Sequence, residues 1–242
     1  MKIRLDQYIM ELGLAGSRNR AQELIKEGFV LLNGKVCNKP AKKIITGSSV
    51  SIVEQQQWVS RAGKKLFEAL KSFEVKVEGK TALDVGSSTG GFTQVLLYEG
   101  AEKITSVDVG TDQLHSSLRN VARISLLEQT DIRDISSRLK DSFDLVVVDV
   151  AFISLSKIIK DIESVARKEG DIILLYKPQF EVGKQNISKN GVVKKETDTQ
   201  KILGHLLKSL EKSCLYFVKC RKAYITGKKG NQEIFLHLKK KC

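Results

Sequence analysis

The chain has 242 residues, of which 41% are hydrophobic, so it can fold as one large domain or as a medium domain with a small one. It has no run of about 18 apolar residues to span a membrane, and its charged N-terminus, MKIRLDQYIMELGL, is a poor signal peptide. Lysine and arginine number 41 against 28 acids, which favours nucleic acid or an anionic membrane surface as a partner, although a solvated lysine-rich surface gives the same balance.

The first 53 residues predict a small α+β domain. Apolar residues from Leu5 to Leu12 fall on one helical face, and Ser17 is a good N-cap for a second helix that stops at Gly28. A strand and the tight turn Asn33-Gly34 follow, and then more short strands. The second helix, a nearby loop and the segment before the first helix carry basic side chains suited to a phosphate backbone, namely Arg4, Arg18, Arg20, Lys26, Lys39, Lys42 and Lys43.

The segments RLDQYI, SRNRAQELIKEGFVLLNGKV and Lys39-Pro40 resemble the S4 RNA-binding domain over about residues 2–53. The resemblance implies that the basic residues named above bind RNA. The alternative is a small α+β module whose arginines are merely solvated. We expect this domain to span residues 1–58, with EQQQWV at 54–59 as a linker and a second domain over 60–242.

The second domain alternates strands with helices. We expect strands at TALDV, KITSVDV, RISLLEQ, FDLVVVDV, GDIILLYK, CLYFVKC and QEIFLHL, and helices at 61–73, 91–99, 111–119, 154–167 and 196–212. This order is typical of an α/β fold with a mostly parallel, Rossmann-like sheet covered on both faces. The last two strands lack a helix between them and are expected to pair as an antiparallel hairpin at one edge.

Ionisable residues stand at the ends of four of these apolar strands: Asp84, Asp108, Asp149 and Lys177. Carboxyl ends of parallel strands meet at one edge, where open α/β sheets bind ligands, and buried charges without partners are costly. The four positions therefore predict a site.

The loop after Asp84 reads GSSTGG, which is not the GxGxxG of dinucleotide-binding loops. A carboxylate there would repel a pyrophosphate and attract a cation. S-adenosylmethionine carries a sulfonium and an ammonium and no phosphate, so we expect it as the cofactor; a Rossmann oxidoreductase is the alternative. Asp108 is placed to take the ribose hydroxyls and Asp131 the adenine amine. The expected cofactor-binding residues are Asp84, Gly86, Ser87, Gly90, Gly91, Phe92, Asp108, Asp131 and Asp149.

Methyl transfer to a ribose 2′-hydroxyl needs a base or a fixed cation near the attacking oxygen. Lys177 is the candidate, since Pro178 holds it extended, and Asp149 is placed to orient its ammonium.

The motifs SRAGKKL, LDVGSSTGGFT, VDVGTDQL, VVVDVAFISL, LLYKPQFEVGK and GNQEIFLHL, behind an S4-like domain, resemble the TlyA family over nearly the whole chain. This family is the S4-fused branch of the FtsJ-like ribose 2′-O-methyltransferases, with a class I S-adenosylmethionine-dependent sheet. The resemblance implies a catalytic tetrad of Lys65, Asp149, Lys177 and Glu233, with Lys64 as a less favoured alternative to Lys65. It also implies cytidine in the ribosomal RNA of the small subunit, the large subunit or both as the substrate.

Two other functions compete with this one. Family names often include haemolysin, and a membrane-lytic protein would need amphipathic segments that enter lipid. A ribosome assembly factor without catalysis is the second. The linker also departs from the family pattern, because Gln56 stands where some relatives carry an arginine.

The four cysteines, Cys37, Cys214, Cys220 and Cys242, include no CxxC pair. They predict neither a zinc site nor a disulfide framework. We therefore expect a cytoplasmic protein of a reducing compartment, without a structural metal.

Overall fold

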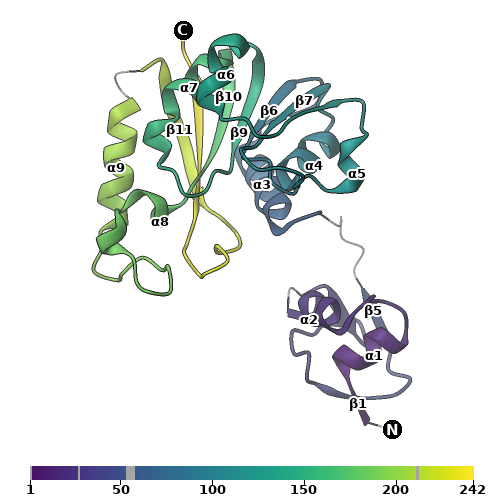
Figure 1. The fold of residues 1–242 in the computed structure, drawn as a ribbon. Helices are drawn as coiled ribbons and strands as arrows, with labels where there is room; N and C mark the ends of the chain where they lie inside the picture. Colours follow the sequence, from purple (N-terminus) through teal and green to yellow (C-terminus); the bar gives the residue numbers. More distant parts are fainter. Residues whose placement is uncertain (1, 27, 53–57, 211–212) are drawn as a thin grey trace. The chain divides into compact units, whose positions relative to one another are not determined.

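The computed structural model describes residues 2–26, 28–52, 58–210 and 213–242 (Figure 1). The chain forms two compact units, Met1–Gln57 and Trp58–Cys242, each with its own hydrophobic core.

The N-terminal unit packs two helices against short strands. Its elements are β1 (Lys2–Arg4), α1 (Leu5–Glu11), α2 (Arg18–Lys26), β2 (Val30–Leu32), β3 (Lys35–Val36), β4 (Lys43–Ile45) and β5 (Val50–Ile52). Strand β2 lies between β3 and β5, and β1 pairs with β4. The Ser17 hydroxyl accepts a hydrogen bond from the Arg20 amide, as expected of a cap, and Asn33 and Gly34 form the turn between β2 and β3 with positive φ angles.

The C-terminal unit is built on a seven-stranded sheet. Its strands are β6 (Thr81–Val85), β7 (Lys103–Val107), β8 (Ile124–Leu127), β9 (Phe143–Val148), β10 (Ala166–Tyr176), β11 (Leu215–Lys222) and β12 (Ile234–Lys240), in the order β11-β12-β10-β9-β6-β7-β8. The five neighbouring strands β8, β7, β6, β9 and β10 pair in parallel. Strand β12 runs antiparallel to both β10 and β11. This confirms the predicted α/β fold class and the antiparallel pair at one edge.

Helices cover both faces of this sheet (Figure 1). They are α3 (Arg61–Phe73), α4 (Gly91–Tyr98), α5 (Ser116–Arg119), α6 (Ile132–Ile135), α7 (Ile159–Val165), α8 (Pro178–Glu181) and α9 (Thr199–Leu210). One core joins α3 and α4 to residues such as Leu145 and Leu175, and the other joins α7 and α9 to residues such as Val146 and Leu174. Consecutive strand residues thus face opposite cores, which explains why the strands are apolar throughout.

Two expected helices are shorter than predicted. The segment 111–119 is helical over α5 alone. The segment 154–167 divides into a 3₁₀ turn, Leu155–Lys157, and α7, because the chain from Ala166 already pairs with Phe143 as the start of β10. A register shift between Ala166 and Asp171 lengthens β10 beyond the apolar run that marked it in the sequence.

The expectation that no cysteines pair is wrong for two of the four. Cys214 and Cys242 form a disulfide, with their Cα atoms 5.6 Å apart. They flank β11 and β12, which pair from Leu215 and Lys240 onward, so the hairpin brings the two residues together. Their separation of 28 residues gave no sign of this, and the cysteine argument for a reducing compartment no longer holds.

The end of the predicted linker that the structure describes is packed onto the C-terminal unit. The Trp58 ring lies 5.3 Å from that of Phe67, and the Val59 amide donates to the Gln94 side chain. The rest of the predicted linker, including Gln56, lies outside the described residues. Within the described part of the chain, no helix has the length and apolar character needed to cross a membrane.

A glycine pair tests how tightly β6 and β9 are joined. Gly86 and Gly79 both have positive φ angles, but a Cβ at Gly86 would lie 2.7 Å from the Asp149 carbonyl oxygen, whereas one at Gly79 would meet nothing within 4 Å. We expect Gly79→Ala to cost about 1 kcal/mol of unfolding free energy through backbone strain. Gly86→Ala should cost about 1–3 kcal/mol more through overpacking. Urea unfolding measures both, and equal losses would contradict this account.

Candidate active site

The predicted site residues gather at the carboxyl edge of the sheet, around the point where the chain order reverses between β6 and β9. Asp108, Asp149 and Lys177 directly follow β7, β9 and β10. Glu233 directly precedes β12, and because β12 is antiparallel, its start lies at this same edge.

The four residues of the predicted tetrad form two ion pairs. The Lys177 Nζ lies 2.6 Å from Asp149 Oδ1, and both side chains are largely buried. The Lys65 Nζ lies 2.6 Å from Glu233 Oε2, and both of these side chains are buried. Tyr176 of β10 pairs with Ile234 of β12. Lys177 directly follows Tyr176 and Glu233 directly precedes Ile234, so both residues stand at the same end of neighbouring strands. Each ion pair joins segments far apart in the sequence.

Local sequence sets the position of each lysine. Lys177 stands at the N-cap of α8 with extended dihedral angles, as expected for a residue before proline. Lys65 lies on the face of α3 that also buries Leu66 and Ala69, so its stem crosses the core before its ammonium reaches Glu233. Its neighbour Lys64 instead lies over the Tyr224 ring, 5.5 Å from the centroid.

The glycine loop connects β6 to α4. Gly86 and Gly90 have φ angles of 84° and 92°, which favour glycine. The Ser88 amide donates to Asp108 Oδ2, and the Gly110 amide donates to Asp108 Oδ1, each at 2.7 Å. Asp108 therefore ties the glycine loop after β6 to the loop after β7. The buried Ser87 hydroxyl finds no hydrogen-bond partner among the described residues.

Asp84 lies beneath this loop and is fully buried. Its Oδ2 accepts a hydrogen bond from the Thr93 hydroxyl at 2.6 Å, which ties β6 to α4. Burial raises the pKa of Asp84 to about 7, even though the hydrogen bond from Thr93 acts in the opposite direction. Its Oδ1 accepts no hydrogen bond from a described residue. The carboxylate is thus held inside the protein rather than at the surface.

Two predicted cofactor-binding residues are engaged elsewhere. The Phe92 ring is buried and stacks on Phe235 with centroids 6.2 Å apart, so this side chain is part of the core. Asp131 caps α6 and pairs with the Arg133 guanidinium, and hydrogen bonds from Arg133 lower the pKa of its carboxyl group. Contact of either residue with a cofactor stays a prediction.

An aromatic pair beside Lys177 was missed by the sequence analysis. Phe152 is 92% exposed, has a φ angle of 64°, and packs on Phe180 with ring centroids 5.3 Å apart. The Phe180 centroid lies 6.0 Å from the Lys177 Nζ. A bulky residue in the left-handed region marks local strain, which often accompanies function, but no residue pattern in AFISL signals it.

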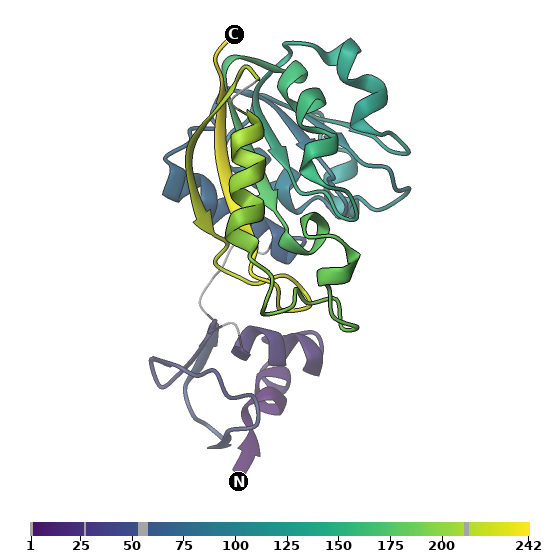
Figure 2. The same cartoon turned by 90° about the vertical axis from the view of Figure 1, so that its left-hand side faces the viewer.

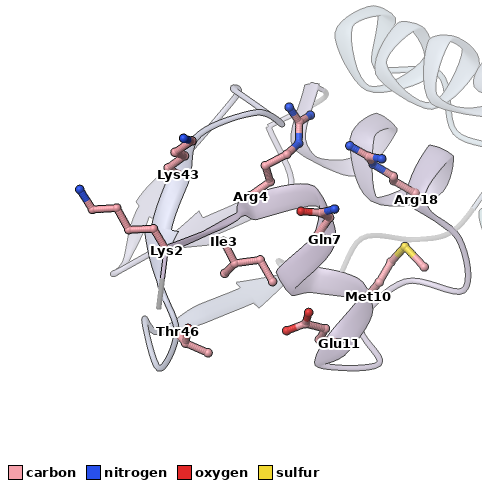
Figure 3. A pocket seen from close by; sticks show the side chains of 9 residues that line it. All are labelled: Lys2, Ile3, Arg4, Gln7, Met10, Glu11, Arg18, Lys43 and Thr46. Atoms are coloured by element: carbon pink, nitrogen blue, oxygen red, sulfur yellow. The ribbon is translucent and has the colours of Figure 1, made fainter.

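The basic residues of the N-terminal unit are partly organised by a buried acid. Asp6 is fully buried and accepts hydrogen bonds from Arg4, Arg18 and Gln22. The Arg4 guanidinium holds the pKa of the Asp6 carboxyl group well below its usual range. Arg4, Arg18 and Lys43 line a hollow of about 610 Å³ (Figure 3).

The other predicted RNA contacts fall in two places. Lys26, Lys39 and Lys42 line a second hollow of about 870 Å³. Arg20 pairs with Glu23 on the exposed face of α2, at 3.4 Å. Sequence reasoning found these basic residues but not the acid that orders two of them.

The sheet order, the glycine loop and the acidic carboxyl edge together define a methyltransferase-type α/β domain. The chemistry of this edge fits a cationic ligand better than a phosphate, since Asp84, Asp108 and Asp149 stand at or next to the carboxyl ends of β6, β7 and β9. Among the described residues, no group of three or more His, Cys, Asp or Glu side chains is placed to hold a metal ion.

Comparisons with known proteins agree with this class. The FtsJ-like methyltransferase family matches residues 58–240, and the S4 domain matches residues 3–50. The chain is 37% identical to the 16S/23S rRNA (cytidine-2'-O)-methyltransferase TlyA of Mycobacterium tuberculosis, covering 98% of this chain and 90% of that protein. It is 41% identical to the 23S rRNA (cytidine-2'-O)-methyltransferase TlyA of Campylobacter jejuni, covering 91% and 93%.

A solved structure called a putative hemolysin, from Streptococcus thermophilus, matches with 34% identity and a TM-score of 0.72, covering 99% of this chain and 89% of that one. The chain therefore belongs to the FtsJ-like methyltransferases and, within them, to the TlyA family, whose members are also named hemolysin A. The resemblance predicted from the sequence is confirmed.

Asp84 gives a pH signature to the stability of the protein without ligand. Its folded pKa of about 7 lies above its ordinary value of 3.8, so between these values the folded state holds a proton that the unfolded state has lost. The free energy of unfolding should therefore fall as pH rises from about 4 to about 7. Asp84→Asn should remove this slope, measured by urea unfolding across the range.

Asp144→Asn is the matched control. Burial favours the neutral form of Asp144, but hydrogen bonds from Thr81 and Arg167 outweigh this and lower its pKa. Its contribution to stability is lost below about pH 4, so its replacement should leave the slope between 4 and 7 in place. If Asp84→Asn kept the wild-type slope, the buried protonated carboxyl group would be ruled out.

Proposed function

We propose that this protein transfers a methyl group from S-adenosylmethionine to a ribose 2′-hydroxyl of ribosomal RNA, on cytidine, in the small subunit, the large subunit or both. The observation that carries the proposal is the Lys177–Asp149 ion pair at the carboxyl edge of a methyltransferase sheet. Support for the substrate comes from the names of the relatives and from the S4 domain that precedes the sheet. On such a substrate the reaction would take place in the cytoplasm, with ribosomal subunits as partners.

The cofactor would lie against the glycine loop. Asp108 would take its ribose hydroxyls, and the acidic edge with Asp84 and Asp149 would favour its positively charged end. Asp84 Oδ1 and the Ser87 hydroxyl, which form no hydrogen bond within the described part of the chain, are polar groups that a ligand or water can satisfy. When bound, the cofactor supplies an activated methyl group on a sulfonium.

The tetrad would act on the acceptor hydroxyl. Lys177 would lie near the 2′-oxygen, where as the neutral amine it would accept the hydroxyl proton, or as an ammonium oriented by Asp149 it would stabilise the developing negative charge. The Lys65–Glu233 pair would hold the opposite side of the site in position, because its burial and short distance restrict both side chains. The Lys177–Asp149 pair would thus take part in the chemistry, and the Lys65–Glu233 pair would position it.

The aromatic pair offers a surface for the target base. Phe152 is exposed and packs on Phe180, whose ring centroid lies 6.0 Å from the Lys177 Nζ. A base drawn out of a stacked RNA strand needs a replacement stacking partner, and aromatic rings provide one. In the N-terminal unit, Arg4 and Arg18 are held at Asp6 and would contact phosphates.

Labelled S-adenosylmethionine, offered with separated small and large subunits from a strain lacking this gene, tests the reaction directly. Wild-type protein should label one or both ribosomal RNAs with a 2′-O-methyl mark. Lys177→Ala should reduce the rate by at least about 10²-fold with cofactor binding kept. Absence of label from both subunits, with cofactor binding confirmed, would overturn the proposed function.

Two further lysine variants refine the roles. Lys177→Arg keeps a positive charge but removes a group able to accept a proton, so activity in this variant would assign Lys177 to charge stabilisation. Lys65→Ala should lower the rate strongly, whereas the neighbouring Lys64→Ala, which leaves the buried pair with Glu233 intact, should change it little. Equal effects of the two alanine variants would remove Lys65 from the tetrad.

Phe152→Ala should weaken RNA use without affecting the cofactor. Loss of one stacking partner corresponds to about 1–3 kcal/mol, so kcat/KM for RNA should fall by roughly 5- to 150-fold. Phe152→Tyr keeps the ring and serves as the control. An unchanged kcat/KM in the alanine variant would exclude a stacking role.

The alternatives make opposite predictions. The family name hemolysin implies that purified protein lyses red cells, whereas a methyltransferase does not. A non-catalytic assembly factor implies that Lys177→Ala rescues a strain lacking the gene. The first assay uses purified wild-type protein, and the second uses the Lys177→Ala gene expressed in that strain.

A further inference from the structure

Two lysine-bearing loops lie side by side next to the tetrad. The first loop comprises residues 184–195, after α8, and the second comprises residues 224–232, before β12. In Figures 1 and 2 both emerge at the end of the sheet where the tetrad lies, one in green and one in yellow. The second loop reaches the site itself, since a Cβ at Gly227 would lie 2.6 Å from Glu233 Oε1.

The loops are strongly and uniformly basic. The first carries four lysines and the second carries two, so together they carry six, and neither contains an acidic residue. All six are exposed, and none of them forms an ion pair with another described residue. They are Lys184, Lys189, Lys194, Lys195, Lys228 and Lys229.

A buried asparagine joins the two loops. Asn231 is 6% exposed, its Oδ1 accepts a hydrogen bond from the Val193 amide at 3.0 Å, and its Nδ2 donates to the Gly191 carbonyl at 2.9 Å. The side-chain amide thus pairs with the first loop as a neighbouring strand would. Lys229 lies close to Gly191 as well, since a Cβ there would be 2.6 Å from its Nζ.

Each loop also has its own internal order. The Ile187–Val193 bridge and the hydrogen bond from the Ser188 amide to the Val192 carbonyl close the first loop. The Gly227 amide donates to the Asn231 carbonyl in the second, and the Arg61 guanidinium donates to the Thr226 carbonyl. The lysines are therefore displayed on ordered backbones, which lowers the entropy lost when a ligand binds them.

We infer that the two loops form one binding surface for the phosphate backbone of RNA, with Asn231 as the positioning residue that keeps them together. The inference rests on the proposed function and adds a contact surface of the C-terminal unit that is distinct from the basic hollows of the N-terminal unit. Unpaired lysines like these attract phosphates without reading bases. Because the second loop reaches Glu233, these lysines would hold the strand that carries the target nucleotide at the site.

The test compares binding to separated ribosomal subunits, over a series of salt concentrations, between wild type and Lys189→Ala/Lys228→Ala. This variant removes one lysine from each loop. The slope of log K against log salt should become shallower by about 1.5, at about 0.7–0.9 for each phosphate contact. Affinity should fall on the order of ten-fold, and KM for RNA should rise while KM for the cofactor stays unchanged.

Lys160→Ala/Lys168→Ala is the charge-matched control, because both lysines lie near the opposite end of the sheet, around a hollow lined by α7 and the start of β10. It should keep the wild-type slope. If the salt-dependence slope became equally shallow in both double variants, RNA affinity would depend on net charge alone, and the inference would be overturned. An unchanged slope in the loop variant would also overturn it.

Asn231→Ala separates positioning from charge. All six lysines remain in this variant, yet KM for RNA should rise several-fold and the slope of log K against log salt should become shallower. A merely structural role of Asn231 would instead lower the unfolding temperature and leave that slope unchanged. Methyl transfer by wild type is measured on the same subunits. If the wild-type protein methylates a subunit and the loop variants bind RNA normally, only this inference fails. If the wild-type protein methylates neither subunit, the proposed function fails. The salt-dependence slopes then still decide whether the loops bind RNA.

Discussion

The carboxyl edge of the seven-stranded sheet holds charges away from water, and the site depends on how those charges are paired. An ammonium or carboxylate removed from water loses several kcal/mol of solvation, which a partner must offset. Lys177 with Asp149 and Lys65 with Glu233 meet this requirement at 2.6 Å each, and together they join α3, β9, β10 and β12 at one point. Among the described residues no cation pairs with Asp84, and burial raises the pKa of its carboxyl group, which favours the protonated form.

This pairing links stability to function. The buried pairs require the strand ends to stay in register, and the glycine at position 86 permits β6 and β9 to approach closely enough for that. The same edge then offers a hydrogen-bonded acid, an oriented lysine and an exposed aromatic ring within one small region. Charged groups fixed in advance lose less free energy to reorganisation during a reaction.

The sequence was sufficient to predict the fold class, because apolar strands alternating with helices leave few topologies. It was also sufficient to predict which edge of the sheet carries the site, because Asp108, Asp149 and Lys177 directly follow their strands. The partners of those residues were another matter. Family resemblance named Glu233 and Lys65, but nothing in the spacing of 168 residues between them indicates a contact. Long-range pairs depend on how the chain folds in space, which local patterns do not encode.

Other features escaped prediction for related reasons. The disulfide joins residues brought together only by the hairpin β11–β12, and Phe152 is marked by a backbone angle rather than by its identity. Asp6 was passed over as a single acid in a basic segment, yet it is the buried centre that orders Arg4 and Arg18.

The antiparallel position of β12 has a consequence for biosynthesis. This strand lies between β10 and β11, so β11 has no partner in the sheet until β12 has been synthesised. Glu233, which directly precedes β12, becomes available to Lys65 at nearly the same point of translation. A nascent chain that has not yet reached Glu233 therefore holds Lys65 without its buried partner.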